Sequence, residues 1–164
     1  MRIFSFLPLL LLLVLLTGCP KEVDESIDDG SYTQTDWMLG KWTCVSGDDK
    51  GTEYTVTRDA DNKAKLISEE KAVNGDLKKY GLIMSTVGKN FFASIYEMNE
   101  DDIATEYYIL KLVKKSNKEL QLVPVKETLV AIGTERDEMV PFLKAHGNEP
   151  GTYDMEDIVT YRKK

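Results

Sequence analysis

The sequence contains little of the chemistry on which most metal and nucleophilic sites depend. Its 164 residues include one histidine and two cysteines, too few for a cluster of His and Cys metal ligands. A Ser-His-Asp arrangement would rest on His146 alone. Basic residues are also scarce, since 21 Lys and Arg against 28 Asp and Glu give a formal net charge of −7. This balance argues against nucleic acid as the main partner. We therefore expect a non-catalytic protein of one domain, without metal or cofactor.

The one long apolar run lies at the N-terminus. It extends from Ile3 to Leu16 behind Arg2 and is interrupted only by Ser5 and Pro8. The run is shorter than the roughly 20 residues that a membrane-spanning helix needs. A short positive start, an apolar core and small residues at the exit are the layout of a secretory signal peptide.

The exit of this segment reads Leu16-Thr17-Gly18-Cys19. It resembles the lipobox of bacterial lipoproteins, in which a cysteine follows a small residue and an upstream leucine. The resemblance implies cleavage after residue 18 and a diacylglycerol on the Cys19 thiol, with acyl chains such as palmitate. Two or three chains together make a durable membrane anchor. The alternative is an ordinary signal peptide with an incidental cysteine.

The residues around this cysteine bear on location and on the second thiol. Position 20 is proline, whereas an aspartate there retains enterobacterial lipoproteins in the inner membrane. The resemblance thus implies the outer membrane in a source with two membranes, with the protein facing the periplasm or the cell surface. A lipidated Cys19 leaves Cys44 without a partner for an intramolecular disulfide. We expect Cys44 to be buried as a small hydrophobe.

Residues 19–36 differ in composition from the rest of the chain. Their only sizeable apolar side chains are Val23, Ile27 and Tyr32, among acidic and small polar residues. Such a segment buries too little surface to offset its ordering entropy. We therefore expect a lipid-anchored flexible tether over residues 19–36 and a single domain over residues 37–164.

Within that domain, turn signals alternate with short runs rich in β-branched and aromatic residues. Short connections force antiparallel neighbours, and a long twisted meander curls until its first and last strands meet. We predict a mainly β fold, an up-and-down meander that closes into a barrel of about 8–10 strands. The expected strands cover residues 41–46, 53–58, 64–72, 77–87, 91–98, 104–115, 119–125 and 157–162.

Two further segments complete this prediction. Apolar residues at spacings of three and four predict a helix near the C-terminus over residues 134–146, with Pro141 either kinking it or marking its start. For residues 128–133 the sequence pattern does not distinguish a strand from a loop. Residues 107–113 are apolar on both faces, which indicates a strand whose outer face is covered by a helix or by a partner.

The ends of the domain carry a resemblance. The stretch Leu39-Gly40-Lys41-Trp42 is similar to the Gly-x-Trp motif on the first strand of lipocalins and fatty-acid-binding proteins, the calycin-like barrels. In those barrels the tryptophan plugs the closed end and an arginine near the C-terminus packs across it. The resemblance implies that Trp42 and Arg162 close the barrel. The Arg-x-Tyr spacing that holds a fatty-acid carboxylate in the cytosolic carriers is absent.

A lipocalin-like barrel implies a small apolar or amphipathic ligand, held among apolar walls with a few hydroxyls. We expect a monomer that meets the membrane only through its lipid. The alternative is a filled barrel that acts through its surface on an envelope protein or a secreted effector, with no ligand cavity. The candidate ligand-binding residues are Tyr54, Met84, Phe92, Tyr96, Tyr108 and Leu110.

Overall fold

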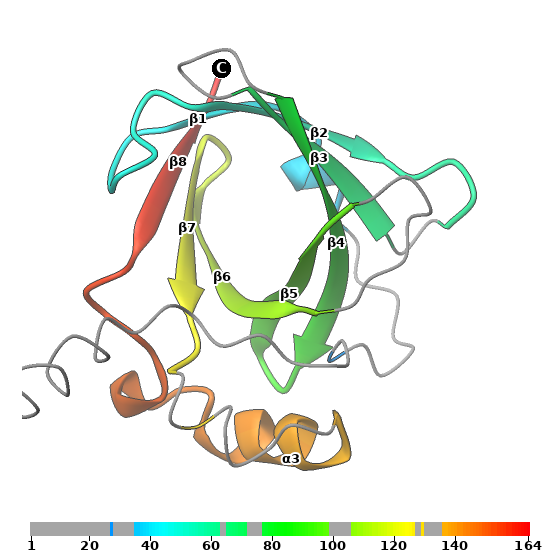
Figure 1. Ribbon diagram of the computed structural model, residues 1–164. Coiled ribbons are helices and arrows are strands. Elements are labelled where there is room, and N and C mark those ends of the chain that lie inside the picture. The colour runs from blue at the N-terminus through cyan, green and yellow to red at the C-terminus, as the bar shows by residue number, and fades with distance from the viewer. Residues whose placement is uncertain are drawn as a thin grey trace, which may run out of the picture.

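The fold is a single closed β-barrel. The computed structural model describes residues 27, 35–62, 65–71, 77–98, 106–126, 129 and 136–164. Eight antiparallel strands follow one another around the barrel in chain order, and the last strand pairs with the first (Figure 1). The strands are β1 (Gly40–Cys44), β2 (Glu53–Arg58), β3 (Lys65–Lys71), β4 (Leu77–Val87), β5 (Asn90–Glu97), β6 (Tyr108–Ser116), β7 (Glu119–Pro124) and β8 (Val159–Lys163). The predicted up-and-down barrel is confirmed.

Alternation along each strand divides the side chains between the inside of the barrel and its outer face. Trp42 pairs with Tyr54 across β1 and β2, and Tyr54 pairs with Glu70 across β2 and β3. Directly paired residues share a face, so these three side chains lie on the same side of the sheet. The buried core on that side comprises Met38, Trp42, Val56, Leu66, Leu82, Met84, Ala93, Leu112 and Leu120.

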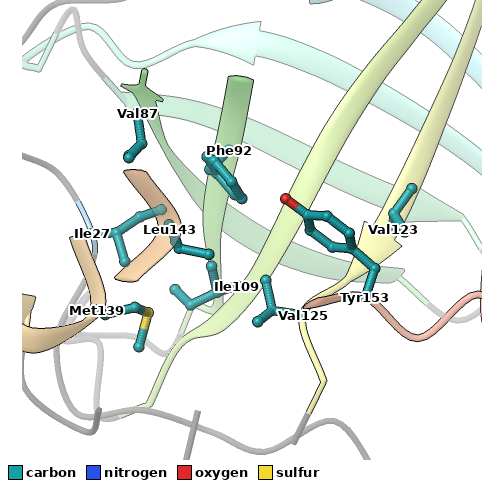
Figure 2. Close-up of a cluster of buried hydrophobic side chains, with 9 residues drawn as sticks. All are labelled: Ile27, Val87, Phe92, Ile109, Val123, Val125, Met139, Leu143 and Tyr153. Carbon is teal, nitrogen blue, oxygen red and sulfur yellow. The ribbon is translucent and has the colours of Figure 1, made fainter. Parts of the chain in front are cut away.

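A second apolar core lies outside the barrel, beneath helix α3 (Arg136–His146). Met139 and Leu143 of the helix pack against outward side chains of the strands, including Phe92, Ile109 and Val123 (Figure 2). The predicted helix near the C-terminus is confirmed over Arg136–His146, and it continues through Pro141. Residues 134 and 135 of the predicted range lie outside the described residues. Residues 128–133, apart from Leu129, lie outside the described residues. Within the described part of the chain, no helix has the length and hydropathy to cross a bilayer.

This second core explains the strand that is apolar on both faces. Leu112 of β6 belongs to the inner core, whereas Ile109 on the opposite face belongs to the outer one. Tyr107 and Val113, at the two ends of this stretch, pack on the outer core as well. The cover is therefore α3 of the same chain, which was one of the two expected possibilities.

The C-terminal end of α3 is fastened to the barrel through one carbonyl oxygen. The Gly147 oxygen accepts hydrogen bonds from Asn90 Nδ2 (3.0 Å), Lys111 Nζ (2.8 Å) and the Tyr153 hydroxyl (2.7 Å). Cationic and polar donors are favourable here because the last carbonyls of a helix lack partners within the helix and carry partial negative charge. Burial lowers the pKa of Lys111 and raises that of Tyr153 to about 12.

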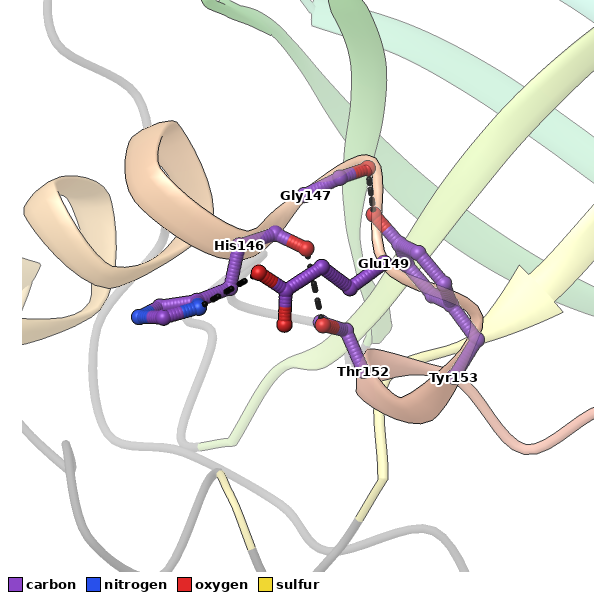
Figure 3. A network of polar contacts seen from close by, with 5 residues as sticks. All are labelled: His146, Gly147, Glu149, Thr152 and Tyr153. Carbon is purple, nitrogen blue, oxygen red and sulfur yellow. Dashed lines mark hydrogen bonds and ion pairs between the residues drawn. The ribbon is translucent and has the colours of Figure 1, made fainter.

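His146 also serves the end of this helix (Figure 3). Its Nδ1 lies 3.1 Å from a carboxylate oxygen of Glu149, and its backbone oxygen accepts a hydrogen bond of 2.8 Å from the Thr152 hydroxyl. The imidazole also packs on the Phe142 ring, with 4.9 Å between centroids. The one histidine of the chain thus takes part in the structure of the helix end.

The predicted boundary between tether and domain is wrong at Ile27. This side chain is fully buried in the outer core (Figure 2). Its backbone N–H donates a hydrogen bond of 3.0 Å to the Ser94 hydroxyl. Thr35 is buried too. Part of the segment assigned to a free tether therefore belongs to the folded domain, because the groove between α3 and the sheet offers Ile27 an apolar site that composition alone does not reveal.

The predicted packing of Arg162 across Trp42 is also wrong, by one residue. Trp42 pairs with Lys163, and the Lys163 ammonium lies 5.4 Å from the centroid of the Trp42 ring. Arg162 pairs with Thr43 instead and reaches Glu119, 3.6 Å away, with most of its side chain exposed. Strand alternation is the reason, since two adjacent residues cannot both point inward.

The backbone conformation explains why a glycine stands in the Gly-x-Trp stretch. Gly40 has a φ of 117°, which L side chains rarely adopt. A Cβ atom there would also lie 3.2 Å from Lys163 Cε. Gly40 thus leaves room for the lysine that lies over Trp42.

Candidate functional site

The barrel encloses a cavity of about 240 Å³. Its walls are mostly apolar, formed by the inward side chains of all eight strands and by Met38 of the short 3-10 helix η1 (Asp36–Met38). The apolar lining residues are Met38, Val56, Leu82, Ile95, Leu110, Leu120 and Leu122. The inside of the barrel is therefore not completely filled by its own side chains.

Trp42 and η1 lie together at this lining. The indole Nε1 donates a hydrogen bond of 2.7 Å to the Met38 carbonyl oxygen, which ties the tryptophan to the segment that precedes β1. The ammonium of Lys163 donates to the Trp37 carbonyl oxygen over 3.0 Å. These contacts fix Trp42 and Trp37 against the segment that precedes β1.

Three tyrosine hydroxyls supply most of the polar character of the cavity. Tyr54 and Tyr161 meet edge to face with 5.3 Å between ring centroids, and their hydroxyls hydrogen-bond to each other. Tyr80, which also lines the cavity, hydrogen-bonds to the Glu70 carboxylate. Burial raises the pKa of all three tyrosines, with the nearby acidic groups adding to the effect. The phenols therefore remain neutral at physiological pH.

Two acidic residues complete the lining. Glu70 lies half-buried near the end of β3, and Asp49 lies exposed on the connection between β1 and β2. Since Asp49 contacts both the cavity and solvent, the cavity opens at this end. Ser68 is the remaining polar residue of the wall.

The predicted ligand-binding residues divide between the two faces of the sheet. Tyr54 and Leu110 line the cavity, and Met84 lies in the inner core without reaching the lining. Tyr108 is half-buried and is not part of the lining.

Phe92 and Tyr96 were assigned to the wrong side. Phe92 is fully buried in the outer core beneath α3 (Figure 2). Tyr96 pairs with Gly81, which does not line the cavity, whereas its neighbour Ile95 does. These two residues were predicted to bind ligand because they are aromatic. Whether a side chain points into the barrel depends instead on its odd or even position along β5.

The lining residues that sequence reasoning missed could have been found from the same parity. Tyr80 and Leu82 alternate with Gly81 along β4, and Tyr161 stands two positions before Lys163 on β8. Counting by twos from Trp42 through the paired strands leads to Tyr54, Val56 and Tyr80. The same pairing places Glu70 on that face, since it stands opposite Tyr54. Asp49 gave no such signal, because it lies on the connection between β1 and β2.

The remaining candidates are structural. Cys44 is buried with its Sγ 2.9 Å from the Ser46 carbonyl oxygen, and burial raises the pKa of the thiol. Asp59 accepts hydrogen bonds from the backbone amides of Asp61 and Asn62, and its other oxygen lies 3.4 Å from Lys65 Nζ. Among the residues that the structure describes, no three His, Cys, Asp or Glu side chains are grouped closely enough to hold a metal ion.

No protein-family model, curated protein or solved structure matches this chain.

Proposed function

We propose that this protein is a lipoprotein of the bacterial cell envelope whose barrel binds a small apolar or amphipathic molecule without transforming it. The observation that carries the proposal is the cavity of about 240 Å³, with apolar walls and three neutral phenol groups. Ligand pockets combine such walls with a few fixed polar groups that orient the ligand. The resemblance of residues 16–19 to a lipobox supports the location.

The apolar strand that suggested the alternative, a filled barrel that docks a protein through its surface, packs against the chain's own helix. The outer face of β6 is covered by α3, and the inside of the barrel holds a cavity. In the described part of the chain, the large apolar side chains that remain exposed are Leu77, Phe91 and Met155. They come from three different segments.

Ligand binding can be tested with an uncharged apolar dye on the chain from residue 19 onward, carrying Cys19→Ser. N-phenyl-1-naphthylamine should gain fluorescence saturably, at one dye per protein. Leu110→Phe places extra atoms in the cavity and should weaken dye binding at least about tenfold. Leu77→Phe adds the same kind of bulk to a side chain that is 75% exposed, so it should leave binding unchanged.

The two variants separate cavity binding from surface binding. A dye signal that neither variant changes would place the dye outside the barrel. The absence of a saturable signal from the parent chain would refute the proposal. Thermal unfolding of each variant establishes that a lost signal does not come from a lost fold.

Substitution of each of the two cysteines in turn tests the lipid anchor. Cys19→Ala should abolish metabolic labelling with a palmitate analogue and release the protein from the membrane fraction. Cys44→Ala is the matched control, because this thiol is buried in the domain and should leave labelling unchanged. Retention of the Cys19→Ala protein in the membrane, with labelling intact, would contradict the assignment.

A further inference from the structure

The charged side chains that line the cavity are acidic. Asp49 and Glu70 belong to the lining, whereas no Lys, Arg or His among the described residues does. We propose that the ligand is an amphipathic cation, an ammonium group on a compact apolar body, with the ammonium held at the end of the cavity where these two carboxylates lie. This inference rests on the proposed function, and it specifies the chemistry of the ligand at the same site.

The aromatic lining suits such a group. Trp42, Tyr54, Tyr80 and Tyr161 all contribute to the cavity wall. The face of an aromatic ring carries negative electrostatic potential and attracts an ammonium, most strongly where water is excluded. The Trp42 ring already has Lys163 Nζ 5.4 Å from its centroid. A cation entering among the three tyrosine rings therefore meets favourable electrostatics from the wall as well as from the carboxylates.

Glu70 is held in place for this role. Its carboxylate accepts a hydrogen bond from the Tyr80 hydroxyl, so the charge is oriented by a group that itself lines the cavity. The Tyr54 and Tyr161 hydroxyls engage each other and offer lone pairs to a donor. An ammonium with N–H groups can use these lone pairs, and a quaternary ammonium can use the ring faces.

Two lysines beside the site have hydrogen-bond or ionic partners of their own. The Lys163 ammonium lies over Trp42 and donates a hydrogen bond to the Trp37 carbonyl oxygen. Lys78 stands opposite Glu70 in the register of β3 and β4, but it is half-exposed, and its Nζ lies 3.8 Å from Glu97. Neither lysine is part of the cavity lining.

The same arrangement disfavours an anionic ligand. A carboxylate head group would approach two like charges, and none of the described lining residues is a basic side chain that could receive it. Like charges at close range repel, more strongly in a partly buried site than in water. A fatty acid should therefore bind more weakly than a cation, or a neutral molecule, of the same length.

Three probes of equal chain length test the proposal: hexyltrimethylammonium, hexan-1-ol and hexanoate. Each is titrated into the chain from residue 19 onward carrying Cys19→Ser, by displacement of the uncharged dye. The ammonium should bind at least about tenfold more tightly than the alcohol, and hexanoate should bind most weakly. Raising the salt concentration should weaken the ammonium alone, because salt screens its attraction to the carboxylates.

Neighbouring glutamates provide a matched pair of variants. Glu70→Gln removes the charge from the cavity and should lower ammonium affinity about tenfold, which equals about 1.4 kcal/mol, with the alcohol unchanged. Glu69→Gln makes the same change in net charge on an exposed outward side chain that pairs with Lys79 at 3.0 Å, and it should change neither affinity. Asp49→Asn, on an exposed connection, provides a second test if Glu70→Gln disturbs the fold.

The outcomes separate this inference from the function on which it rests. Binding of the alcohol and hexanoate with affinities equal to or above that of the ammonium would overturn the cationic ligand and leave a ligand-binding barrel. An equal loss in Glu69→Gln and Glu70→Gln would also overturn it, since the attraction would then come from net charge. Failure of the dye and of all three probes would overturn both proposals.

Discussion

The packing of Ile27 gives a prediction that distinguishes a free tether from a docked one. We expect Ile27→Ala to destabilise the folded protein. Ile27 is fully buried, and shortening it to Ala removes three carbon atoms from the outer core. At roughly 0.8 kcal/mol for each buried methylene, transfer to water accounts for about 2.4 kcal/mol, and an unfilled cavity adds to it.

The loss has an upper limit set by the way this segment attaches. Ile27 lies apart in sequence from the strands and helix that surround it, so a weakened segment can undock while the barrel stays folded. The measured change cannot exceed the free energy with which the segment docks. We therefore expect a loss of about 2–3 kcal/mol, near the lower end of the usual range for buried isoleucine.

The assay is urea unfolding of the chain from residue 19 onward with Cys19→Ser, followed by tryptophan fluorescence. Leu77→Ala is the control, since this leucine is 75% exposed and its loss should change stability by less than about 0.5 kcal/mol. Ser94→Ala removes the acceptor of the Ile27 N–H and should cost about 1 kcal/mol. This cost should shrink in the Ile27→Asp background, where the segment no longer docks.

A change below about 0.5 kcal/mol for Ile27→Ala would refute the reasoning. It would mean that the buried position contributes nothing to folding and that the tether is free, as composition indicated. Equal effects of Ser94→Ala in both backgrounds would show that the serine acts through another contact.

Three further predictions concern the outer face of the barrel. A Cβ atom on Gly81 would lie 2.2 Å from the Tyr96 ring, so Gly81→Ala should displace that ring and cost about 1–3 kcal/mol in urea unfolding. Tyr153→Phe removes one of three donors to the Gly147 oxygen, and it should cost only about 1 kcal/mol because two donors remain; a loss above about 3 kcal/mol would contradict this. Hydrogen bonds from backbone amides hold the pKa of Asp59 below its ordinary value, so its charge stabilises the fold at neutral pH. That contribution should be complete above about pH 5 and should disappear as the pH falls from about 3.9 through the lower folded-state value. The stability difference between the parent chain and Asp59→Asn should shrink over the same range, and a difference independent of pH would contradict the assignment.

The strands could be predicted from the sequence because their signals are local. Residues 53–58 and 77–87 coincide with β2 and β4, since each run of β-forming residues is bounded by turn-forming ones. The barrel itself follows from short connections, which leave no alternative to antiparallel neighbours. The helix over 136–146 was visible in its apolar spacing, even with Pro141 inside it.

The site was less predictable because it depends on which face of a strand a side chain occupies. Tyr54 and Leu110 lie inside and Phe92 lies outside, although all three are large apolar or aromatic residues on β-rich runs. An error of one residue changes the face, as the exchange of Arg162 for Lys163 beside Trp42 demonstrates.

By itself, the sequence determined the strand order and the position of the helix, because these depend on neighbours along the chain. Only the tertiary structure decided that the barrel keeps a cavity, that Ile27 docks beneath α3 and that Asp49 and Glu70 share one space with four aromatic rings. Those features depend on volumes and distances between residues far apart in the chain, which closure of the sheet brings together.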